Sequence, residues 1–285
     1  MTLPLRSLPA GLALVAGLAT TPAPVQAAQS YDSCAGFIDA LPATISTQGV
    51  WCLRKNLSTA ITSGNAITIA TNNVTIDCND FKIGGLAAGD SSTARGIYAN
   101  NRQNASVRHC AIRGFYFGIN LDGGAGHLVE DNRLDNSLFS GIWVAFADNN
   151  RVQRNRVYDT GGVPGGADSY GILADADVID NTVAGVFATA TDTFPSGIYI
   201  FDSGSEARGN QVRGLAVAGT GQAIGILVGN SDITLADNRI SAAAVTPGYG
   251  IYGGGANTFC TGNTVVNFAT NYFSCEHTVD NLPAP

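Results

Sequence analysis

Two short patterns recur along almost the whole chain and constrain its fold more than any other feature. The first is Gly-Ile, whose copies are 22 to 30 residues apart: Gly96-Ile97, Gly118-Ile119, Gly141-Ile142, Gly171-Ile172, Gly197-Ile198, Gly225-Ile226 and Gly250-Ile251. The second is Asn-x-apolar, which begins at Asn132, Asn155, Asn181, Asn210, Asn238 and Asn263. A repeat length in the twenties is typical of a solenoid, in which each repeat packs only on its neighbours.

The residues around these patterns alternate between apolar and polar, as in Asn65-Ala66-Ile67-Thr68-Ile69. Period two predicts strands, whereas helical repeats need a period of 3.6. At roughly 3.3 Å per residue, about 22 residues make one coil of three short strands. The sequence therefore predicts an all-β fold, a right-handed parallel β-helix that forms a single-stranded solenoid of about eight coils with three parallel sheets.

The Asn row is predicted to be structural. A tight corner between strands favours a residue that tolerates left-handed backbone, and Asn is such a residue. Amides stacked at the strand spacing can also hydrogen-bond from coil to coil. We therefore expect this row to hold neighbouring coils together and to carry no chemistry.

The uneven spacing of the two patterns predicts where a ligand binds. Extra residues collect before the Gly-Ile strands, in segments 83–95, 160–170, 184–196, 215–222 and 242–249. Insertions stacked along one edge of a sheet form a wall, and a wall beside a sheet makes a groove. Long loops on one face are where repeat proteins usually bind their ligands.

The floor of this groove is expected to be aromatic. If each Ile points inward, the next residue points outward, and four of these seven outward residues are aromatic. Flat rings suit the apolar faces of sugars, so we expect substrate contacts from Tyr98, Asn120, Trp143, Tyr170 and Tyr252. The alternative is that the rings pack beneath the loops.

The N-terminal residues predict export. Arg6 precedes an apolar run at 8–19 that is too short to span a bilayer, and Val25-Gln26-Ala27 is typical of a cleavage site. We expect a signal peptide at 1–27, an N-terminal cap and first coil at 28–72, repeats at 73–258, and a C-terminal coil and cap at 259–285. The product is expected to be a secreted or periplasmic monomer without a membrane span. A formal charge of −7 argues against nucleic acid as a partner.

Export permits disulfides, and the chain has six Cys residues. The preferred pairs join Cys34 to Cys52, Cys78 to Cys110 and Cys260 to Cys275, because the members of each pair fall on the same or adjacent coils. Fifteen pairings are formally possible, so the alternatives remain open.

These features resemble the pectate-lyase-like superfamily of right-handed parallel β-helices. The likeness includes the lead-in with Cys34, Gly49-Val50-Trp51-Cys52-Leu53 and Asn73-Val74-Thr75-Ile76-Asp77-Cys78-Asn79, and it extends to about Cys275. The resemblance is specific for the fold and weak for activity, because it implies lyases, epimerases, polygalacturonases, tailspikes or adhesins without chemistry. It also implies a site on the loop-walled groove.

The candidate chemistry is that of a polysaccharide (uronan) lyase or epimerase. Such a reaction needs a base and a positive charge beside the uronate carboxylate, and the catalytic candidates are Asp175, Asp202, Arg95 and Tyr199. An acidic groove that binds an acidic polymer would call for Ca²⁺, although no metal-ligand motif is present. The polygalacturonase motifs are missing, and His127 is expected to be a surface turn residue. The alternative is a non-catalytic envelope-surface or adhesive module that binds a glycan without turnover.

Overall fold

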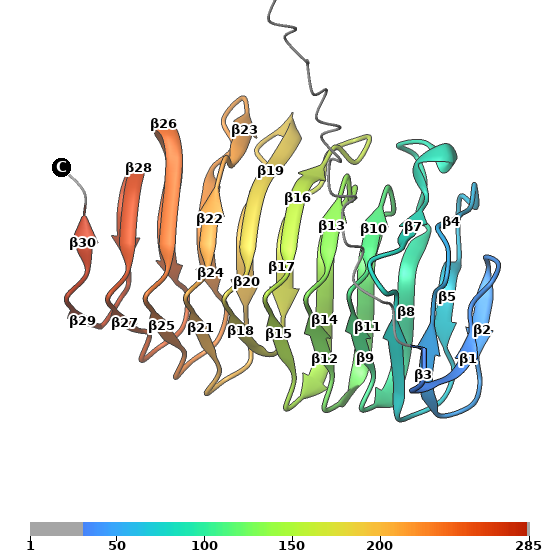
Figure 1. Cartoon of the computed structure of the whole chain (residues 1–285). Helices are drawn as coiled ribbons and strands as arrows, with labels where there is room; N and C mark the ends of the chain where they lie inside the picture. The colour runs from blue at the N-terminus through green and yellow to red at the C-terminus, as the bar shows by residue number, and fades with distance from the viewer. Residues whose placement is uncertain (1–30, 284–285) are drawn as a thin grey trace, which may run out of the picture. The chain divides into compact units, whose positions relative to one another are not determined.

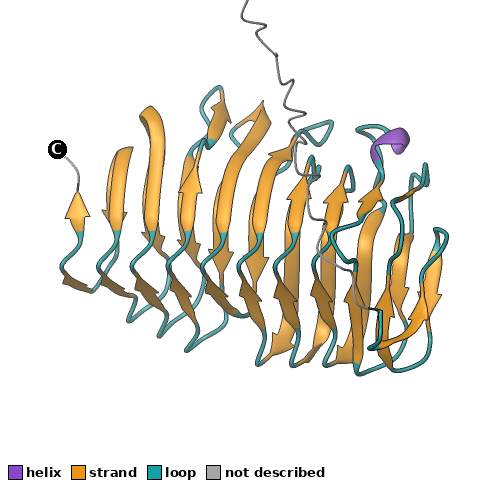
Figure 2. Ribbon diagram, in the orientation of Figure 1, coloured by secondary structure: helices purple, strands orange, loops and turns teal. Residues whose placement is uncertain are grey.

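The computed structural model describes residues 31–283, and these form a parallel β-solenoid of about nine coils. Each coil contributes up to three strands, and almost all connections between them are turns or loops (Figures 1 and 2). The described residues include one short helical segment, the 3₁₀ turn η1 (Leu86–Ala88). None of the described helices has the length and hydrophobicity of a membrane span.

Equivalent strands of successive coils pair in parallel and form three ladders. The back sheet consists of β1 (Cys34–Phe37), β3 (Gly49–Cys52), β6 (Val74–Asp77), β9 (Ser106–Arg108), β12 (Leu128–Glu130), β15 (Arg151–Gln153), β18 (Asp177–Ile179), β21 (Glu206–Arg208), β25 (Thr234–Ala236), β27 (Phe259–Thr261) and β29 (His277–Val279).

The side sheet follows the back sheet in each coil. It consists of β4 (Leu57–Ser58), β7 (Lys82–Gly84), β10 (Ala111–Arg113), β13 (Arg133–Asp135), β16 (Arg156–Gly161), β19 (Thr182–Thr191) and β22 (Gln211–Arg213). The floor sheet contains the Gly-Ile strands and is made of β2 (Ala43–Ile45), β5 (Asn65–Ile69), β8 (Arg95–Gln103), β11 (Phe117–Ala125), β14 (Ser140–Asp148), β17 (Tyr170–Ala174), β20 (Ser196–Ile200) and β24 (Ala223–Val228).

In the last coils the side and floor sheets become continuous. Strands β26 (Arg239–Gly253) and β28 (Thr264–Phe273) each pair with both ladders, and β30 (Leu282–Pro283) follows. The segment 242–249, which was predicted as an inserted loop, is therefore part of β26. Its backbone continues the ladder because β28 supplies pairing partners alongside it.

The core is an axial stack of aliphatic side chains. Ile97, Ile119, Ile142, Ile172 and Ile198 lie in register on successive floor strands and are fully buried. Contacts repeat from coil to coil because the period-two pattern keeps the same residues inside.

The Gly of each Gly-Ile pair is explained by crowding at the corner of the coil. A Cβ added to Gly141 would lie 2.7 Å from the carbonyl oxygen of Gly171 on the next coil. Real Cβ atoms do not approach backbone oxygens that closely, so the position requires Gly.

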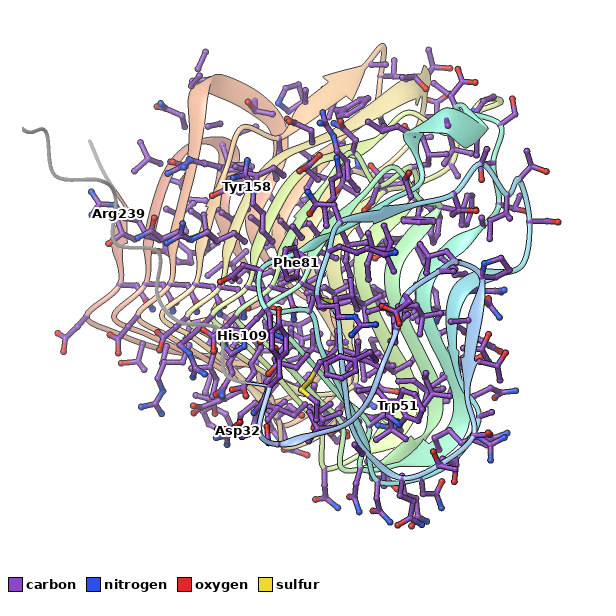
Figure 3. All side chains as sticks on the ribbon, turned by 45° about the vertical axis from the view of Figure 1, so that its right-hand side comes forward. Asp32, Trp51, Phe81, His109, Tyr158 and Arg239 are labelled. Atoms are coloured by element: carbon purple, nitrogen blue, oxygen red, sulfur yellow. A yellow bond between two sulfur atoms is a disulfide. The ribbon has the colours of Figure 1, made fainter. Side chains whose placement is uncertain are left out.

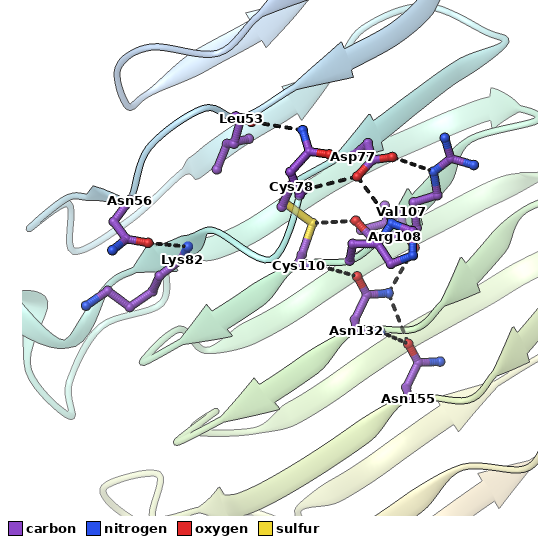
Figure 4. The surroundings of a disulfide bond; sticks show 12 residues. Leu53, Asn56, Asp77, Cys78, Lys82, Val107, Arg108, Cys110, Asn132 and Asn155 are labelled. Atoms are coloured by element: carbon purple, nitrogen blue, oxygen red, sulfur yellow. Dashed lines mark hydrogen bonds and ion pairs between the residues drawn. A yellow bond between two sulfur atoms is a disulfide. The ribbon is translucent and has the colours of Figure 1, made fainter. Parts of the chain in front are cut away.

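The asparagine ladder joins the coils at the corner between the back and side sheets. The Oδ1 atom of Asn155 accepts hydrogen bonds from the backbone N–H and the side-chain amide of Asn132, both at 3.0 Å. The same pattern repeats through Asn181, Asn210, Asn238, Asn263 and Asn281. The predicted coil-to-coil amide bonding is confirmed (Figure 4).

One part of the ladder prediction was wrong. The ladder residues themselves do not adopt left-handed backbone; the residue before each of them does, with φ of 55° at Asp131, 53° at Arg154 and 55° at Asp180. The ladder amides are buried and must reach both neighbouring coils, while the preceding residue turns the chain at the surface. Hydrogen bonding between coils and the left-handed turn of the backbone, which we had both predicted for Asn, are thus divided between adjacent residues.

All three preferred disulfides are confirmed: Cys34–Cys52, Cys78–Cys110 and Cys260–Cys275. The described residues contain no free Cys. The Cys78–Cys110 bridge lies beside the first rung of the ladder, where the Asn132 side chain accepts a hydrogen bond from the backbone N–H of Cys110 (Figure 4). The predicted signal peptide at 1–27 lies outside the described residues.

Candidate functional site

The floor sheet presents the predicted row of outward side chains. Tyr98, Asn120, Trp143, Leu173, Tyr199, Leu227 and Tyr252 are partners in register from β8 to β26. Insertions between side and floor strands lie along one edge of this sheet, which is the upper edge in Figure 1. The predicted position of these insertions is therefore confirmed. Part of the wall, however, is formed by the strands β19, β23 (Ala216–Ala218) and β26 and not by loops.

A continuous group of rings covers the centre of this floor, and we call it the aromatic strip. Its members are Tyr116, Phe117, Phe139, Trp143, Tyr170, Tyr199 and Phe201. Ring centroids are 5.3 Å apart for Phe117 and Trp143, and 5.9 Å apart for Tyr170 and Tyr199. The rings pack against one another, yet each remains partly exposed. The strip is therefore a preformed apolar surface that spans four floor strands.

The other predicted contact residues differ in what they expose. Tyr98 is partly exposed beside Arg95, and Tyr252 belongs to a separate ring group in which its centroid lies 4.8 Å from that of Phe273. Asn120 is only 4% exposed, so its side chain offers little surface to a ligand. Neighbouring large side chains explain this burial, because Tyr98 and Trp143 flank Asn120 in the same row.

Arg95 lies at one end of the strip, away from the other catalytic candidates. Its guanidinium is 4.7 Å from the ring centroid of Tyr98 and 5.7 Å from that of Phe117. Four strand steps separate β8 from β20, which amounts to about 19 Å at the usual strand spacing. Arg95 therefore cannot act on the same sugar ring as Tyr199.

The structure brings Asp175, Asp202 and Tyr199 together at the carboxyl ends of β17 and β20. Burial and the nearby charge of Asp202 raise the pKa of the Asp175 carboxyl to about 6. Burial and the charge of Asp175 in turn raise the pKa of the Tyr199 hydroxyl. These carboxylates and this phenol are close enough for their charges to interact, and Asp175 can exchange a proton near neutral pH.

Phe146 completes this group from the neighbouring coil. Its backbone N–H donates a hydrogen bond of 2.6 Å to Asp175 Oδ2, and its side chain is 76% exposed. The residue has left-handed backbone with φ of 56°, which is strained for a bulky residue. Period-two patterning does not reveal this exposed ring, because the left-handed residue interrupts the alternation.

Tyr170 in the aromatic strip also has a shifted pKa, but in the direction that keeps its proton bound. Burial, a hydrogen bond with Asp168 and the charges of Asp168 and Tyr199 raise the pKa of Tyr170 to about 12. Its hydroxyl therefore stays protonated at neutral pH and can donate a hydrogen bond.

An open hollow of about 460 Å³ adjoins the cluster formed by Asp175, Asp202 and Tyr199. Asp202 lines it together with Asn149, Asn150, Arg151 and Asp177. Arg151 Nη2 lies 3.3 Å from Asp177 Oδ2 on the neighbouring back strand and is half exposed, so the hollow that Asp202 lines also contains a cation. Sequence reasoning missed Arg151 because it belongs to the back sheet, where charged residues are ordinary.

The carboxylates present do not fit a calcium site. Calcium takes six to eight oxygen ligands, several of them from carboxylates. Among residues 31–283, no group of three or more His, Cys, Asp or Glu side chains converges in a way that could hold a metal ion. Asp175 also already accepts a backbone hydrogen bond from Phe146.

His127 does not lie at the surface as expected. It is 2% exposed, and its Nδ1 accepts a hydrogen bond of 3.3 Å from the backbone N–H of Ala105, while Nε2 lies 3.1 Å from the carbonyl oxygen of Gly123. Burial lowers the pKa of the imidazole. His127 is thus a neutral corner residue that bridges two coils, because the Gly-rich turn folds back over it.

Comparisons with known proteins found structural matches and one family match. A structural match is the A-module of the Azotobacter vinelandii mannuronan C-5 epimerase AlgE4, with a TM-score of 0.53 at 12% identity, over 84% of this chain and 80% of that one. The Dettilon tailspike protein (TM-score 0.43, 15% identity) matches 82% of this chain, which spans only 54% of the tailspike chain. The periplasmic alginate epimerase AlgG (TM-score 0.45, 10% identity) matches over 82% and 74% of the two chains.

No curated protein matches the sequence. The family model described as "Right handed beta helix region" matches residues 47–214, which is more than half of the chain. The repeats, the parallel ladders and this match agree, and the chain belongs to the right-handed β-helix family.

Proposed function

We propose that the floor sheet binds a polysaccharide chain lengthwise. The observation that carries the proposal is the aromatic strip, whose partly exposed rings follow one another across four adjacent strands. Aromatic faces are good platforms for the apolar C–H faces of sugars. Ring positions repeat at about the strand spacing of 4.8 Å, so an extended chain can contact several rings at once.

The proposed ligand is an envelope or extracellular glycan. Three disulfides are typical of proteins that mature in an oxidising compartment such as the periplasm or the cell exterior. The epimerase module named above has only the fold in common with this chain, but it makes polyuronates a sensible first choice among test polymers.

Binding is tested with Trp143→Ala and Tyr199→Ala against a panel of neutral and acidic polysaccharides, by affinity electrophoresis and calorimetry. Each variant should weaken binding about tenfold, because losing one stacked ring removes roughly 1–1.5 kcal/mol of contact. Phe259→Ala is the matched control, since Phe259 is a 38% exposed ring on β27 of the back sheet. Wild-type affinity in both floor variants would refute the proposal.

A second candidate function is proton transfer on the bound sugar, as in a uronan lyase or epimerase. It is favoured by the raised pKa of Asp175 beside Tyr199. In an elimination, Asp175 accepts the proton from C5, the C4–O4 bond breaks as a C4–C5 double bond forms, and the Tyr199 hydroxyl gives its proton to O4. Both groups lie on the floor and meet the same face of the sugar, which suits elimination better than epimerisation, where protons leave and arrive on opposite faces.

The test is incubation with polyuronates, with and without Ca²⁺, while the ultraviolet absorbance of an unsaturated uronide is followed. Asp175→Asn and Tyr199→Phe should each lower the rate at least a hundredfold. Arg95→Gln should leave the rate within a few-fold and weaken affinity, since it lies four strands away. If the polymer binds but no product forms on any polymer, the protein is a binding module without turnover.

A further inference from the structure

The outward face of the side sheet carries much of the chain's positive charge. Two outward rows run along it in register, and they contain Lys82, Arg113, Arg133, Arg156, Arg213 and Arg239, all exposed. We call these six residues the basic face. The same rows contain one acid, Asp135, whose Oδ1 lies 2.6 Å from Arg113 Nε. The two rows thus contain six basic residues and one acidic residue, although the whole chain has a formal charge of −7.

Two of these bases lie directly opposite each other. Arg133 on β13 pairs in register with Arg156 on β16. Like charges that face each other on adjacent strands destabilise a sheet. Neither guanidinium has a carboxylate within salt-bridge distance among residues 31–283. The guanidinium carbon of Arg133 instead lies 5.8 Å from the ring centroid of Tyr158. The pair therefore lacks an internal counter-ion.

An open hollow of about 420 Å³ lies at this pair. Arg133, Arg154 and Arg156 line it, together with the acids Asp80 and Asp131. Arg154 is already bound to Glu130 at 2.6 Å and to Asp131 at 2.8 Å, so Asp131 is engaged as well. An external anion in the hollow would meet Arg133 and Arg156, whose charges are not neutralised by such pairs.

We infer that the basic face binds an anionic polysaccharide, as a second ligand surface distinct from the aromatic strip. The bases extend over the six strand steps from β7 to β26, about 29 Å, so they can contact several acidic groups of one linear chain. Arginine forks suit carboxylate and sulfate groups.

An extended polymer fits this surface better than a lipid bilayer does. Between the bases the rows carry Ala111, Thr182, Gln211 and Ser241, which are too small or too polar to insert into lipid. Tyr158 and Arg239, labelled in Figure 3, belong to these rows. Nucleic acid is disfavoured because the disulfides indicate an exported protein. The inference does not depend on the function proposed for the floor.

The test compares the double variant Arg133→Gln/Arg156→Gln with Arg54→Gln/Arg208→Gln. The control removes the same charge from two exposed arginines that lie off the side sheet and have carboxylate partners. Polygalacturonate and dextran sulfate are the probes, and neutral dextran, anionic phospholipid vesicles and a DNA duplex are the competitors. The wild type should bind both polyanions with an affinity that falls steeply with salt.

The side-sheet double variant should raise Kd at least tenfold, while the control changes it less than twofold. Trp143→Ala/Tyr199→Ala should weaken dextran sulfate binding less than the side-sheet variant does and should leave its salt dependence in place, which separates this surface from the floor. The thermal midpoint of the side-sheet variant should not fall, because a repulsion has been removed. The inference is overturned if the wild type binds neither polyanion, if both charge variants weaken binding equally, if only the floor variant loses binding, or if vesicles or DNA bind more tightly.

Discussion

The backbone N–H of Phe146 donates a 2.6 Å hydrogen bond to the carboxylate of Asp175 on the next coil. This bond favours the charged carboxylate and lowers its pKa, but burial and the charge of Asp202 act in the opposite direction and outweigh it. Asp175 is consequently a carboxyl that gains and loses its proton near pH 6 in the folded protein. The contact also fixes Phe146 at the rim of the floor.

Asp175 should make the stability of the protein depend on pH. Its pKa rises from 3.8 to about 6 on folding, so between these values the folded state holds a proton that the unfolded state has lost. Stability therefore falls as pH rises through this window and stays lower above it. Asp175→Asn should raise the thermal midpoint by about 2 °C at pH 8, after discounting for the partial exposure of the group.

Calorimetric scans of both proteins across this pH range measure the effect. The rise in thermal midpoint caused by Asp175→Asn should shrink towards zero below pH 3.8, the pKa of this carboxyl in the unfolded chain. An equal gain at pH 8 and at pH 3.5 would contradict the raised pKa.

The strained backbone of Phe146 predicts a difference between two small substitutions. Gly tolerates φ of 56° and Ala does not, so Phe146→Gly should be about 1 kcal/mol more stable than Phe146→Ala. Both variants lack the exposed ring, so this comparison isolates the backbone. Urea unfolding measures it, and equal midpoints would show that the turn is not left-handed.

The asparagine ladder should be sensitive at its centre. Asn181 is 1% exposed, donates to the Val152 carbonyl oxygen at 2.9 Å, and accepts from both amide groups of Asn155. Asn181→Ala leaves several buried groups unsatisfied and should lower the free energy of unfolding by about 3 kcal/mol or more.

Asn100→Ala on β8 is the matched control for this loss. Asn100 is exposed, so its removal should change stability by less than about 0.5 kcal/mol. Urea unfolding of the two variants should therefore give clearly different midpoints, and similar midpoints would show that the ladder amides add little.

The Cys78–Cys110 bridge closes 32 residues between adjacent coils. Chain-entropy arguments predict that replacing both Cys residues with Ala lowers the free energy of unfolding by about 3–4 kcal/mol. Peptide mapping under non-reducing conditions checks the pairing, and thermal unfolding checks the magnitude. A variant as stable as the wild type would mean that ladder bonds alone hold these coils together.

The repeat made the fold predictable in advance. Ile142 and Asn155 have equivalents on almost every coil, so the inward position of the Ile row and the corner position of the Asn row are each indicated by six or seven copies. The Cys pairs were predictable for the same reason, because Cys78 and Cys110 fall at neighbouring repeat positions.

The site was harder to predict because it depends on departures from the repeat. In the sequence, Arg95 and Asp175 both flank Gly-Ile strands and are equivalent candidates for the groove. In the fold, they lie three strands apart along the axis of the solenoid. Phe146 lies where no pattern marks it, and the burial of His127 results from a turn that folds over the ring. The whole-chain charge concealed the basic face, since a sum over residues contains no information about which side of a sheet they share.

Successive rungs of the asparagine ladder from Asn132 to Asn281 are 23, 26, 29, 28, 25 and 18 residues apart, and yet each rung makes the same hydrogen bonds to the next. Most of this length variation is absorbed at the corner between the side and floor sheets, and the rest at the ends of the floor strands, in both cases away from the bonded rungs. Mutation can therefore lengthen, shorten or exchange the segments nearest a ligand while leaving the scaffold intact. Such a chain can change what it recognises without having to evolve a new way to stay folded.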